Sequence, residues 1–593
     1  MKTSSGLDSD QRLAWDSAQA LWGVRMHEPI LEPDAQESSF AWFSFPPRIT
    51  VDPVAAKKLR VTGMWESIFA HELGHHVLSP STRVVDLKIR QQMARAITAT
   101  AIQPRVALSA KSALLSNLWS DMLINVRVSE LQHRVAPTVE PQMIGMWRVL
   151  ESKHTTSAIW WVTMHAYEEL WGLADGSLCG LTPPAMPEAS ADYTSLYASD
   201  PVIDSSLLAE TVRTFADDPI RGALRFGMIM APYLLADQEE VNRAHVLQAC
   251  GGDVSSGAPT PAELDEVMRD KRLRETPVHP VLEGRAADTG STDTDAESEG
   301  GRPEQQGYGL AETLRLYEGN DESTVLDSWY AAEARGWVRP YRQLATATSH
   351  EESMPGALEL WSLEDELEQI DWPATLTTSP KVIPGVTTRL RTHFADDIPR
   401  QQESVHLDLY IDSSGSMRPP RAESPAVLAG TILIMSVLSG GGRVRVTSFS
   451  GPGDVAGSER FSRERAESMR RLLTYFGGGT TFPLDLLARR YAQPKPSAAA
   501  PLARRHLVVL SDEGLASFFG TGQENYAGVA ADVRLRLDTA TLLVMDRFKS
   551  IADPAARAGY DVGYLESMDD APAACAALAQ RIANYSELER SRG

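Results

Sequence analysis

Two histidines and a glutamate stand close together near the N-terminus, in the run His71-Glu72-Leu73-Gly74-His75. On a helix, side chains four residues apart lie one above the other, so His71 and His75 can reach one Zn²⁺ while Glu72 stands beside its open side. Apolar residues recur at helical spacing through this run, which predicts an amphipathic helix. The spacing therefore predicts metal-assisted hydrolysis with Glu72 as the base. The alternative is a helix whose two histidines are ordinary surface or core residues.

The best candidate for a third zinc ligand is Asp121, in a later stretch that is otherwise apolar. Asn117, Asp121 and Asn125 are spaced by four residues, so on a helix they form a narrow polar stripe. A buried carboxylate without a counter-charge is costly, and Zn²⁺ would supply that charge. We therefore expect Asp121 to bind the metal. Asn117 and Asn125 would not touch the metal but would hydrogen-bond to its ligands or fix a nearby loop. The alternatives are a stripe that faces solvent, or another ligand, with Glu130 and Glu168 in reserve.

A second set of oxygen-bearing side chains follows predicted strands near the C-terminus. The strand-like run 405–411 leads directly into Asp412-Ser413-Ser414-Gly415-Ser416, where a carboxylate and two hydroxyls alternate on a tight turn. Further on, the glycines 477–479 precede Thr480 and Thr481, and the apolar run 507–510 ends in Ser511-Asp512. In an open parallel sheet, ligands bind beyond the carboxyl ends of the strands. The pattern predicts a hard-cation site for Mg²⁺, or for Mn²⁺ or Ca²⁺, held by Asp412, Ser414, Ser416, Thr480 (or Thr481) and Asp512.

Length and composition limit the classes to which the chain can belong. Its 593 residues exceed what one core usually holds, so two to four domains are expected. The formal charge of −22 disfavours nucleic acid and anionic membranes as partners, since both need clustered Lys and Arg. The three cysteines are scattered without a CxxC pair, which argues against a disulfide framework and against a thiolate zinc site. No signal peptide or apolar span is recognisable, so we expect a cytoplasmic protein.

Changes in composition divide the chain into four parts. Residues 1–250 alternate apolar helical stretches with short breaks, which predicts an α-rich domain of α+β type. Residues 251–309 are polar, acidic and glycine-rich, which predicts a disordered linker. Residues 310–400 predict a connecting α+β segment, and residues 401–593 alternate strands and helices as in a doubly wound, Rossmann-like α/β domain. The expected protein is therefore multidomain.

The hard-cation residues resemble the metal-ion-dependent adhesion site of von Willebrand factor A domains, which is written DxSxS, then Thr, then Asp. The resemblance covers about Gln401 to the C-terminus. It implies that the five residues named above hold the ion directly or through water. Asp512 is followed by Glu513 where the family usually has glycine, so the third loop departs from the pattern.

The run from His71 to His75 matches the HExxH pattern of zinc metallopeptidases, so the N-terminal domain would be zincin-like. Joined to a von Willebrand A domain, it resembles predicted bacterial metallopeptidases that work with MoxR-type AAA+ ATPases. In that family a helix with Asp and Asn four apart follows the HExxH helix, as Asp121 and Asn125 do here. The resemblance implies a zinc peptidase that acts on a protein or peptide and recruits the ATPase through its Mg²⁺ site.

The competing hypothesis is a non-catalytic adaptor or chaperone-like protein. Its von Willebrand A domain would present clients to an AAA+ ATPase, and its zinc site would be structural or decayed. Glu72 favours the enzyme, because a purely structural site needs ligands and no base.

Overall fold

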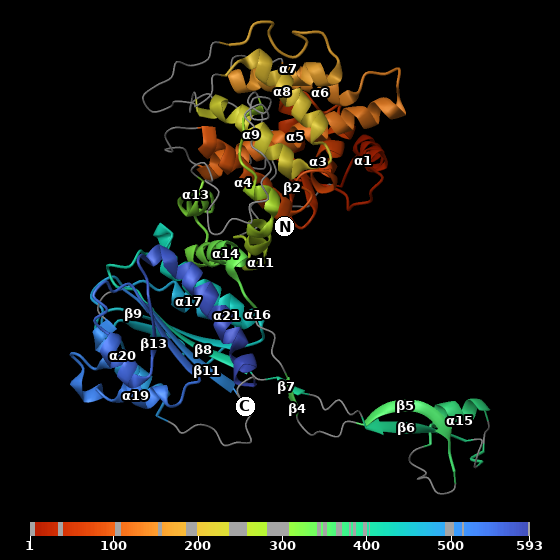
Figure 1. The fold of residues 1–593 in the computed structure, drawn as a ribbon. Helices are drawn as coiled ribbons and strands as arrows, with labels where there is room; N and C mark the ends of the chain where they lie inside the picture. Colours follow the sequence, from red (N-terminus) through yellow and green to blue (C-terminus); the bar gives the residue numbers. More distant parts are fainter. Residues whose placement is uncertain are drawn as a thin grey trace, which may run out of the picture. The chain divides into compact units, whose positions relative to one another are not determined.

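The computed structural model divides into two compact units, Met1–Ala332 and Glu333–Gly593. Figure 1 shows both units, which are described separately below. The structure describes residues 6–33, 40–100, 108–151, 157–184, 199–235, 258–280, 308–340, 345–347, 353–362, 370–378, 381–383, 387–394, 400–402, 404–492, 503–512 and 515–590.

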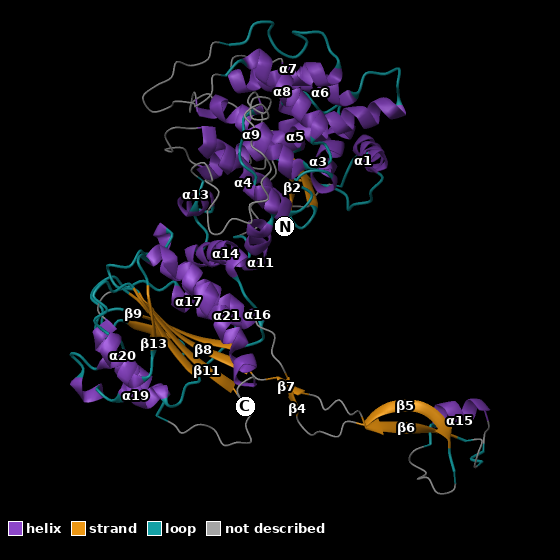
Figure 2. Ribbon diagram, viewed as in Figure 1, coloured by secondary structure: helices purple, strands orange, loops and turns teal. Residues whose placement is uncertain are grey.

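The first unit consists of helices and one small sheet (Figure 2). Its elements are α1 (Ser9–Trp22), β1 (Ile30–Leu31), β2 (Ala41–Ser44), β3 (Arg48–Val51), α2 (Pro53–Lys58), α3 (Trp65–Val77), α4 (Arg83–Thr100), α5 (Leu108–Val135), α6 (Gln142–Glu151), α7 (Ala158–Trp171), α8 (Pro201–Thr214), α9 (Pro219–Leu235), α11 (Pro261–Arg269), the 3-10 helix η2 (Lys271–Arg274), α13 (Leu310–Leu316) and α14 (Glu322–Ala334). The predicted α-rich character of this region is confirmed.

Helix α3 lies at the centre of the part that carries the candidate chemistry. It packs against α1, α5, α6 and strand β2. Strand β2 pairs with β3 in antiparallel fashion, and β1 pairs with β3 in parallel, so the sheet order is β1-β3-β2. Helix α3 ends at Val77 because Pro80 follows soon after, and proline cannot continue a helix. Its neighbour α5 runs for 28 residues and carries the whole predicted polar stripe.

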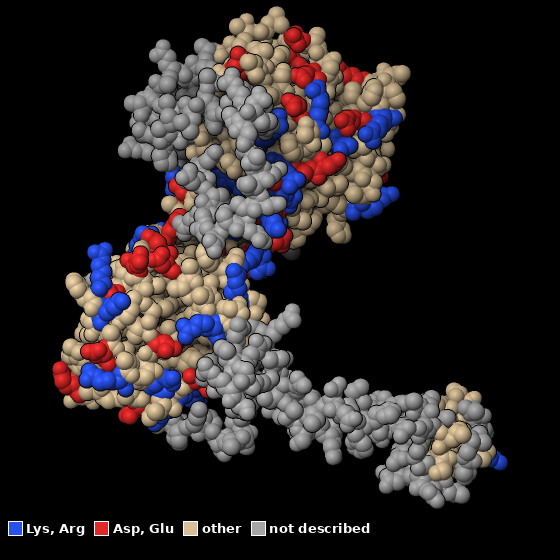
Figure 3. Space-filling view, viewed as in Figure 1, with Lys and Arg blue, Asp and Glu red and all other residues tan. Residues whose placement is uncertain are grey.

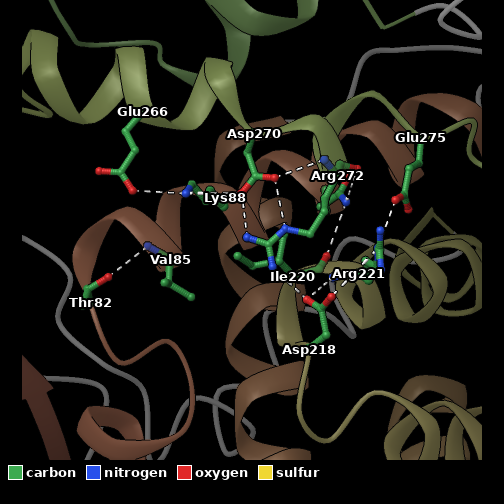
Figure 4. A network of polar contacts seen from close by, with 11 residues as sticks. Thr82, Val85, Lys88, Asp218, Ile220, Arg221, Glu266, Asp270, Arg272 and Glu275 are labelled. Carbon is green, nitrogen blue, oxygen red and sulfur yellow. Dashed lines mark hydrogen bonds and ion pairs between the residues drawn. The ribbon is translucent and has the colours of Figure 1, made fainter.

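Residues 258–280 were predicted to belong to the disordered linker, and for them the prediction is wrong. They form α11 and η2, and Leu264 of α11 is fully buried. Lys88 of α4 pairs through Nζ with Glu266 at 3.2 Å and with Asp270 at 3.3 Å (Figure 4). This stretch is polar in composition, but it contains a short amphipathic helix whose apolar side packs against α4. The rest of the predicted linker lies outside the described residues.

The second unit contains a six-stranded sheet and two small hairpin-like pairs of strands. Its elements are η3 (Arg335–Trp337), β4 (Ala345–Ala347), β5 (Ser353–Leu360), α15 (Trp372–Thr378), β6 (Thr388–Phe394), β7 (Arg400–Gln402), β8 (Ser404–Asp412), η5 (Pro420–Ala422), α16 (Pro425–Ser439), β9 (Arg443–Phe449), β10 (Val455–Gly457), α17 (Arg465–Leu472), α18 (Leu484–Arg490), β11 (Ala503–Ser511), η6 (Leu515–Phe519), η7 (Glu524–Tyr526), α19 (Val529–Arg534), β12 (Thr539–Val544), α20 (Ala552–Ala558), β13 (Asp561–Tyr564), η8 (Met568–Asp570) and α21 (Ala571–Arg590).

The sheet of the second unit has the order β10-β9-β8-β11-β12-β13, and only β10 is antiparallel to its neighbour. Helices lie on both of its faces, with α16, α17 and α21 on one and α19 and α20 on the other (Figure 1). From β8 the chain moves outward to β9 and β10, then returns to β11 on the opposite side of β8. The carboxyl ends of β8 and β11 thus form a topological switch point, where open α/β sheets bind their ligands.

Two further observations concern the surface and the helices. On the face drawn in Figure 3, the described Lys and Arg side chains are interspersed with Asp and Glu over both units. Within the described part of the chain, every helix is too short or too polar to cross a bilayer.

Candidate metal centres

The three predicted zinc ligands meet inside the first unit. His71 and His75 project from α3, and Asp121 projects from α5. The two Nε2 atoms are 3.2 Å apart, and each is 3.4 Å from Asp121 Oδ1. Ligand atoms at zinc bond lengths, placed at the corners of a tetrahedron, are separated by about 3.4 Å. All three separations therefore fit one tetrahedral ion.

Each histidine has its other ring nitrogen fixed by an oxygen that can only accept. The Nδ1 of His71 lies 2.7 Å from Asn125 Oδ1, and the Nδ1 of His75 lies 3.0 Å from the carbonyl oxygen of Ser79. Both Nδ1 atoms therefore carry a proton, so each histidine presents its Nε2 atom to the point beside Asp121 where an ion would lie. This is how proteins orient histidine ligands. Asn125 donates in turn to the Tyr167 hydroxyl at 2.8 Å.

Asn117 also supports the centre, because its amide donates to Asp121 Oδ2 at 3.1 Å. The polar stripe predicted on α5 thus faces inward, toward α3, and the solvent-facing alternative is wrong. Phe43 of β2 adds a packing contact, with its ring stacked on His75 at 4.2 Å between centroids. Helices α3 and α5 and strand β2, which lie far apart in the sequence, thus hold the predicted ligands in place.

Glu72 is fully buried, and neither of its carboxylate oxygens has a hydrogen-bond partner among the described residues. Burial raises the pKa of Glu72 to about 8, with the charge of His71 opposing this shift and the charge of Asp121 adding to it. A buried, unpartnered carboxylate is costly, and a divalent cation held beside it removes much of that cost. The donor set, its separations and this carboxylate all fit zinc.

The reserve ligands lie elsewhere in the structure. Glu130 faces outward on α5, where it pairs with Arg127 at 3.5 Å and with Arg134 at 3.9 Å. Glu168 belongs to a different cluster on α7, with His165 and Cys179. Among the described residues, the Asp121 carboxylate is the one that groups with the two histidines.

The predicted hard-cation residues gather at the carboxyl edge of the second unit's sheet. Asp412 ends β8, and its Oδ1 accepts from the Ser414 backbone amide at 2.8 Å. The hydroxyls of Ser414 and Ser416 are 3.2 Å apart. Ser511, which the sequence did not single out, donates its hydroxyl to Asp412 Oδ2 at 2.6 Å and thereby orients that carboxylate.

The second loop of this set is joined to the first by backbone hydrogen bonds. The amide of Gly415 donates to the Gly478 carbonyl at 2.9 Å, and the amide of Gly477 donates to the Ser413 carbonyl at 3.0 Å. A Cβ on Gly415 would lie 3.4 Å from backbone atoms of Gly478, which is an ordinary van der Waals contact. Thr480 follows directly in this loop and is half-buried, as is Thr481. The structure therefore leaves both threonines as candidates.

Asp512 completes the set from the end of β11. Its side chain is buried, and its Oδ1 has no hydrogen-bond partner in the described part of the chain. Burial raises the pKa of Asp512; a hydrogen bond to Ser416 opposes the shift, and the nearby charge of Asp412 adds to it. Two neighbouring buried carboxylates and a pair of hydroxyls suit a hard divalent cation. Glu513, where the loop departs from the family pattern, lies outside the described residues.

Comparison with known proteins adds little to this geometry. No family model matches the chain, and no curated protein matches it. Among solved structures, the crystal structure of the Deinococcus radiodurans RO (RSR) protein matches 83% of this chain and 99% of its own, with 14% identity and a TM-score of 0.19. A score this low does not indicate a shared fold, so the match supports no statement about fold or function.

Proposed function

We propose that the chain is a zinc-dependent peptidase with a zincin-like first unit. The observation that carries the proposal is the convergence of two Nε2 atoms and one carboxylate oxygen at separations of 3.2 to 3.4 Å, beside the unpartnered carboxylate of Glu72. A zinc ion held there would polarise a peptide carbonyl and lower the pKa of water to about 7. Glu72 takes a proton from the attacking water and delivers it to the departing amide nitrogen.

Removing the metal is expected to abolish proteolysis. The full chain would be freed of metal with a strong chelator, and hydrolysis of a labelled, unfolded protein would be measured before and after returning Zn²⁺. Returned Mg²⁺ serves as the control and should restore nothing, because imidazole ligands suit zinc and not magnesium. Proteolysis by protein shown to be metal-free would contradict the proposal.

The adaptor hypothesis stays the second candidate, because one observation favours it. The zinc ligands are nearly inaccessible, with Asp121 4% exposed and His75 fully buried. A zinc ion that a substrate cannot reach would serve the fold and not catalysis. A zinc-loaded wild-type chain that never cleaves any unfolded protein, alone or with its partner, would support the adaptor.

For the second unit we propose a von Willebrand A domain that binds a partner, a MoxR-type AAA+ ATPase, through an ion at the carboxyl edge of the sheet. Mg²⁺ prefers six oxygen ligands and keeps water where protein groups are lacking. An Asp or Glu of the partner can replace one of those waters. The buried, unpartnered oxygen of Asp512 and the paired hydroxyls of Ser414 and Ser416 support this proposal.

Asp412→Ala is expected to abolish capture of the purified ATPase by the full chain, because it removes the carboxylate that the Ser414 amide and the Ser511 hydroxyl hold at the site. EDTA should have the same effect on the wild type. The matched control is Asp532→Ala, which removes an exposed aspartate of α19 in the same unit. Equal capture by wild type, Asp412→Ala and wild type in EDTA would contradict ion-bridged docking and leave the peptidase proposal untouched.

A further inference from the structure

A second group of metal-ligating side chains lies at the end of α7. His165 and Glu168 stand three residues apart on the last turns of the helix, and Cys179 comes from the turn that follows it. Glu168 Oε2 is 2.9 Å from His165 Nδ1 and 3.6 Å from Cys179 Sγ. One ligand atom from each residue lies within 4.8 Å of the other two.

The structure aims Glu168 at this point through backbone amides. The amides of Leu178 and Cys179 donate to its Oε1, and the amide of Gly176 donates to Oε2. Burial opposes ionisation, but these hydrogen bonds and that of His165 outweigh it and hold the pKa of Glu168 below its ordinary value. The carboxylate is therefore ionised at neutral pH, and one of its oxygens faces both the imidazole and the thiol.

His165 is also held in place, because its ring stacks on Trp161 at 4.6 Å between centroids. Its side chain is 21% exposed, so the cluster borders on solvent and a water can reach it. The turn that brings Cys179 back toward the helix passes through Gly172 and Gly176, both at positive φ (64° and 81°). Glycine adopts that conformation at no steric cost, so the sequence is suited to this tight return.

We propose that His165, Glu168 and Cys179 bind a second zinc ion, separate from that of His71, His75 and Asp121. Imidazole, thiolate and carboxylate together are a donor set for zinc and exclude hard ions such as Mg²⁺. At zinc bond lengths, a tetrahedral sulfur–oxygen pair is about 3.6 Å apart and a nitrogen–oxygen pair about 3.4 Å apart. The first matches the structure, whereas the 2.9 Å between His165 Nδ1 and Glu168 Oε2 is shorter than the second. A water from the solvent side takes the fourth position.

This ion would have a structural role with an effect on the first centre. It ties the turn after α7 to the helix, and α7 also carries Tyr167, whose hydroxyl accepts the hydrogen bond from Asn125. Asn125 in turn fixes His71. The alternative is an ion-free cluster, in which the imidazole and the thiol both donate hydrogen bonds to Glu168.

Cobalt substitution and zinc counting on the full chain distinguish the two. We expect two zinc ions per wild-type chain and one in Cys179→Ser. The Co²⁺-loaded wild type should show the near-ultraviolet absorption of a thiolate bound to cobalt, and Cys179→Ser should lose it. His165→Gln is expected to weaken the band.

Two controls separate this site from the rest of the chain. Cys575→Ser, which changes a buried free cysteine of the second unit, should keep both the band and the zinc count. Asp121→Ala should keep the band while losing one zinc, so failure of the first centre and failure of the second are distinguishable. A wild-type chain with one zinc and no thiolate band, or a band that survives Cys179→Ser, would overturn the proposal.

Discussion

Replacing Glu72 by glutamine is expected to lower the rate of peptide hydrolysis by about 100- to 10,000-fold, the range that a positioned general base contributes. Glutamine keeps the shape of the side chain but cannot take a proton from water. The three predicted zinc ligands are His71, His75 and Asp121, so the Glu72→Gln variant should bind as much zinc as the wild type. The measurement pairs initial rates on a labelled, unfolded protein with elemental analysis of the same samples.

Glu130→Gln is the matched control for this variant. Glu130 is an exposed carboxylate of the same unit, and its surface ion pairs with Arg127 and Arg134 contribute little to stability. It should therefore show wild-type rates. Loss of zinc in Glu72→Gln would make Glu72 a structural ligand, and unchanged hydrolysis would show that another group is the base.

Asp121→Ala is expected to reduce the zinc affinity of the first centre by more than the 10- to 100-fold that loss of an outer hydrogen-bond partner typically costs. In the proposed centre the aspartate is one of three protein ligands, and its oxygen lies 3.4 Å from the Nε2 atom of each histidine. Competition with a chromophoric chelator measures the affinity. Asn117→Ala, which removes only a hydrogen bond to Asp121, should show a smaller loss.

Undiminished affinity in the Asp121 variant would contradict the assignment. The ligand would then have to come from a residue that the fold holds elsewhere, since Glu130 is on the surface and Glu168 lies in the second cluster. His71→Ala should behave like Asp121→Ala, because each change leaves two protein ligands.

Much of the first centre follows from spacing along single helices. His71 and His75 share a face of α3 because they are four residues apart, and Asp121 could be predicted because a polar stripe in an apolar helix must meet a partner. The cluster at Cys179 could not be predicted in the same way, because the residue returns to α7 through a turn fixed by backbone amides. The scattering of the cysteines along the sequence argues against a thiolate zinc site, but spacing along the chain does not record that Cys179 Sγ lies 3.6 Å from Glu168 Oε2.

For the fold, too, local patterns in the sequence predict some features and leave others undetermined. The alternation of strand-like and helical stretches after residue 401 predicts the parallel sheet, since runs such as 405–411 and 507–510 end in turn residues. The order of the strands, which places Asp412 beside Ser511, depends on long-range pairing that no local pattern records. Helix α11 was missed because nine residues are too few to outweigh the polar composition around them.

For the peptidase proposed above, burial of the three predicted zinc ligands would make the isolated chain latent. His71, Glu72 and His75 are at most 1% exposed, so an extended peptide reaches them only in an opened form. The observed rate then scales with the population of that form, and a chain that is open one per cent of the time works about a hundredfold below its intrinsic rate. A partner that binds the open form more tightly raises the rate by up to that factor without touching the chemistry. Activity would then be controlled by the access of substrate to the buried site. An ATP-driven partner would open the site only where it presents a substrate.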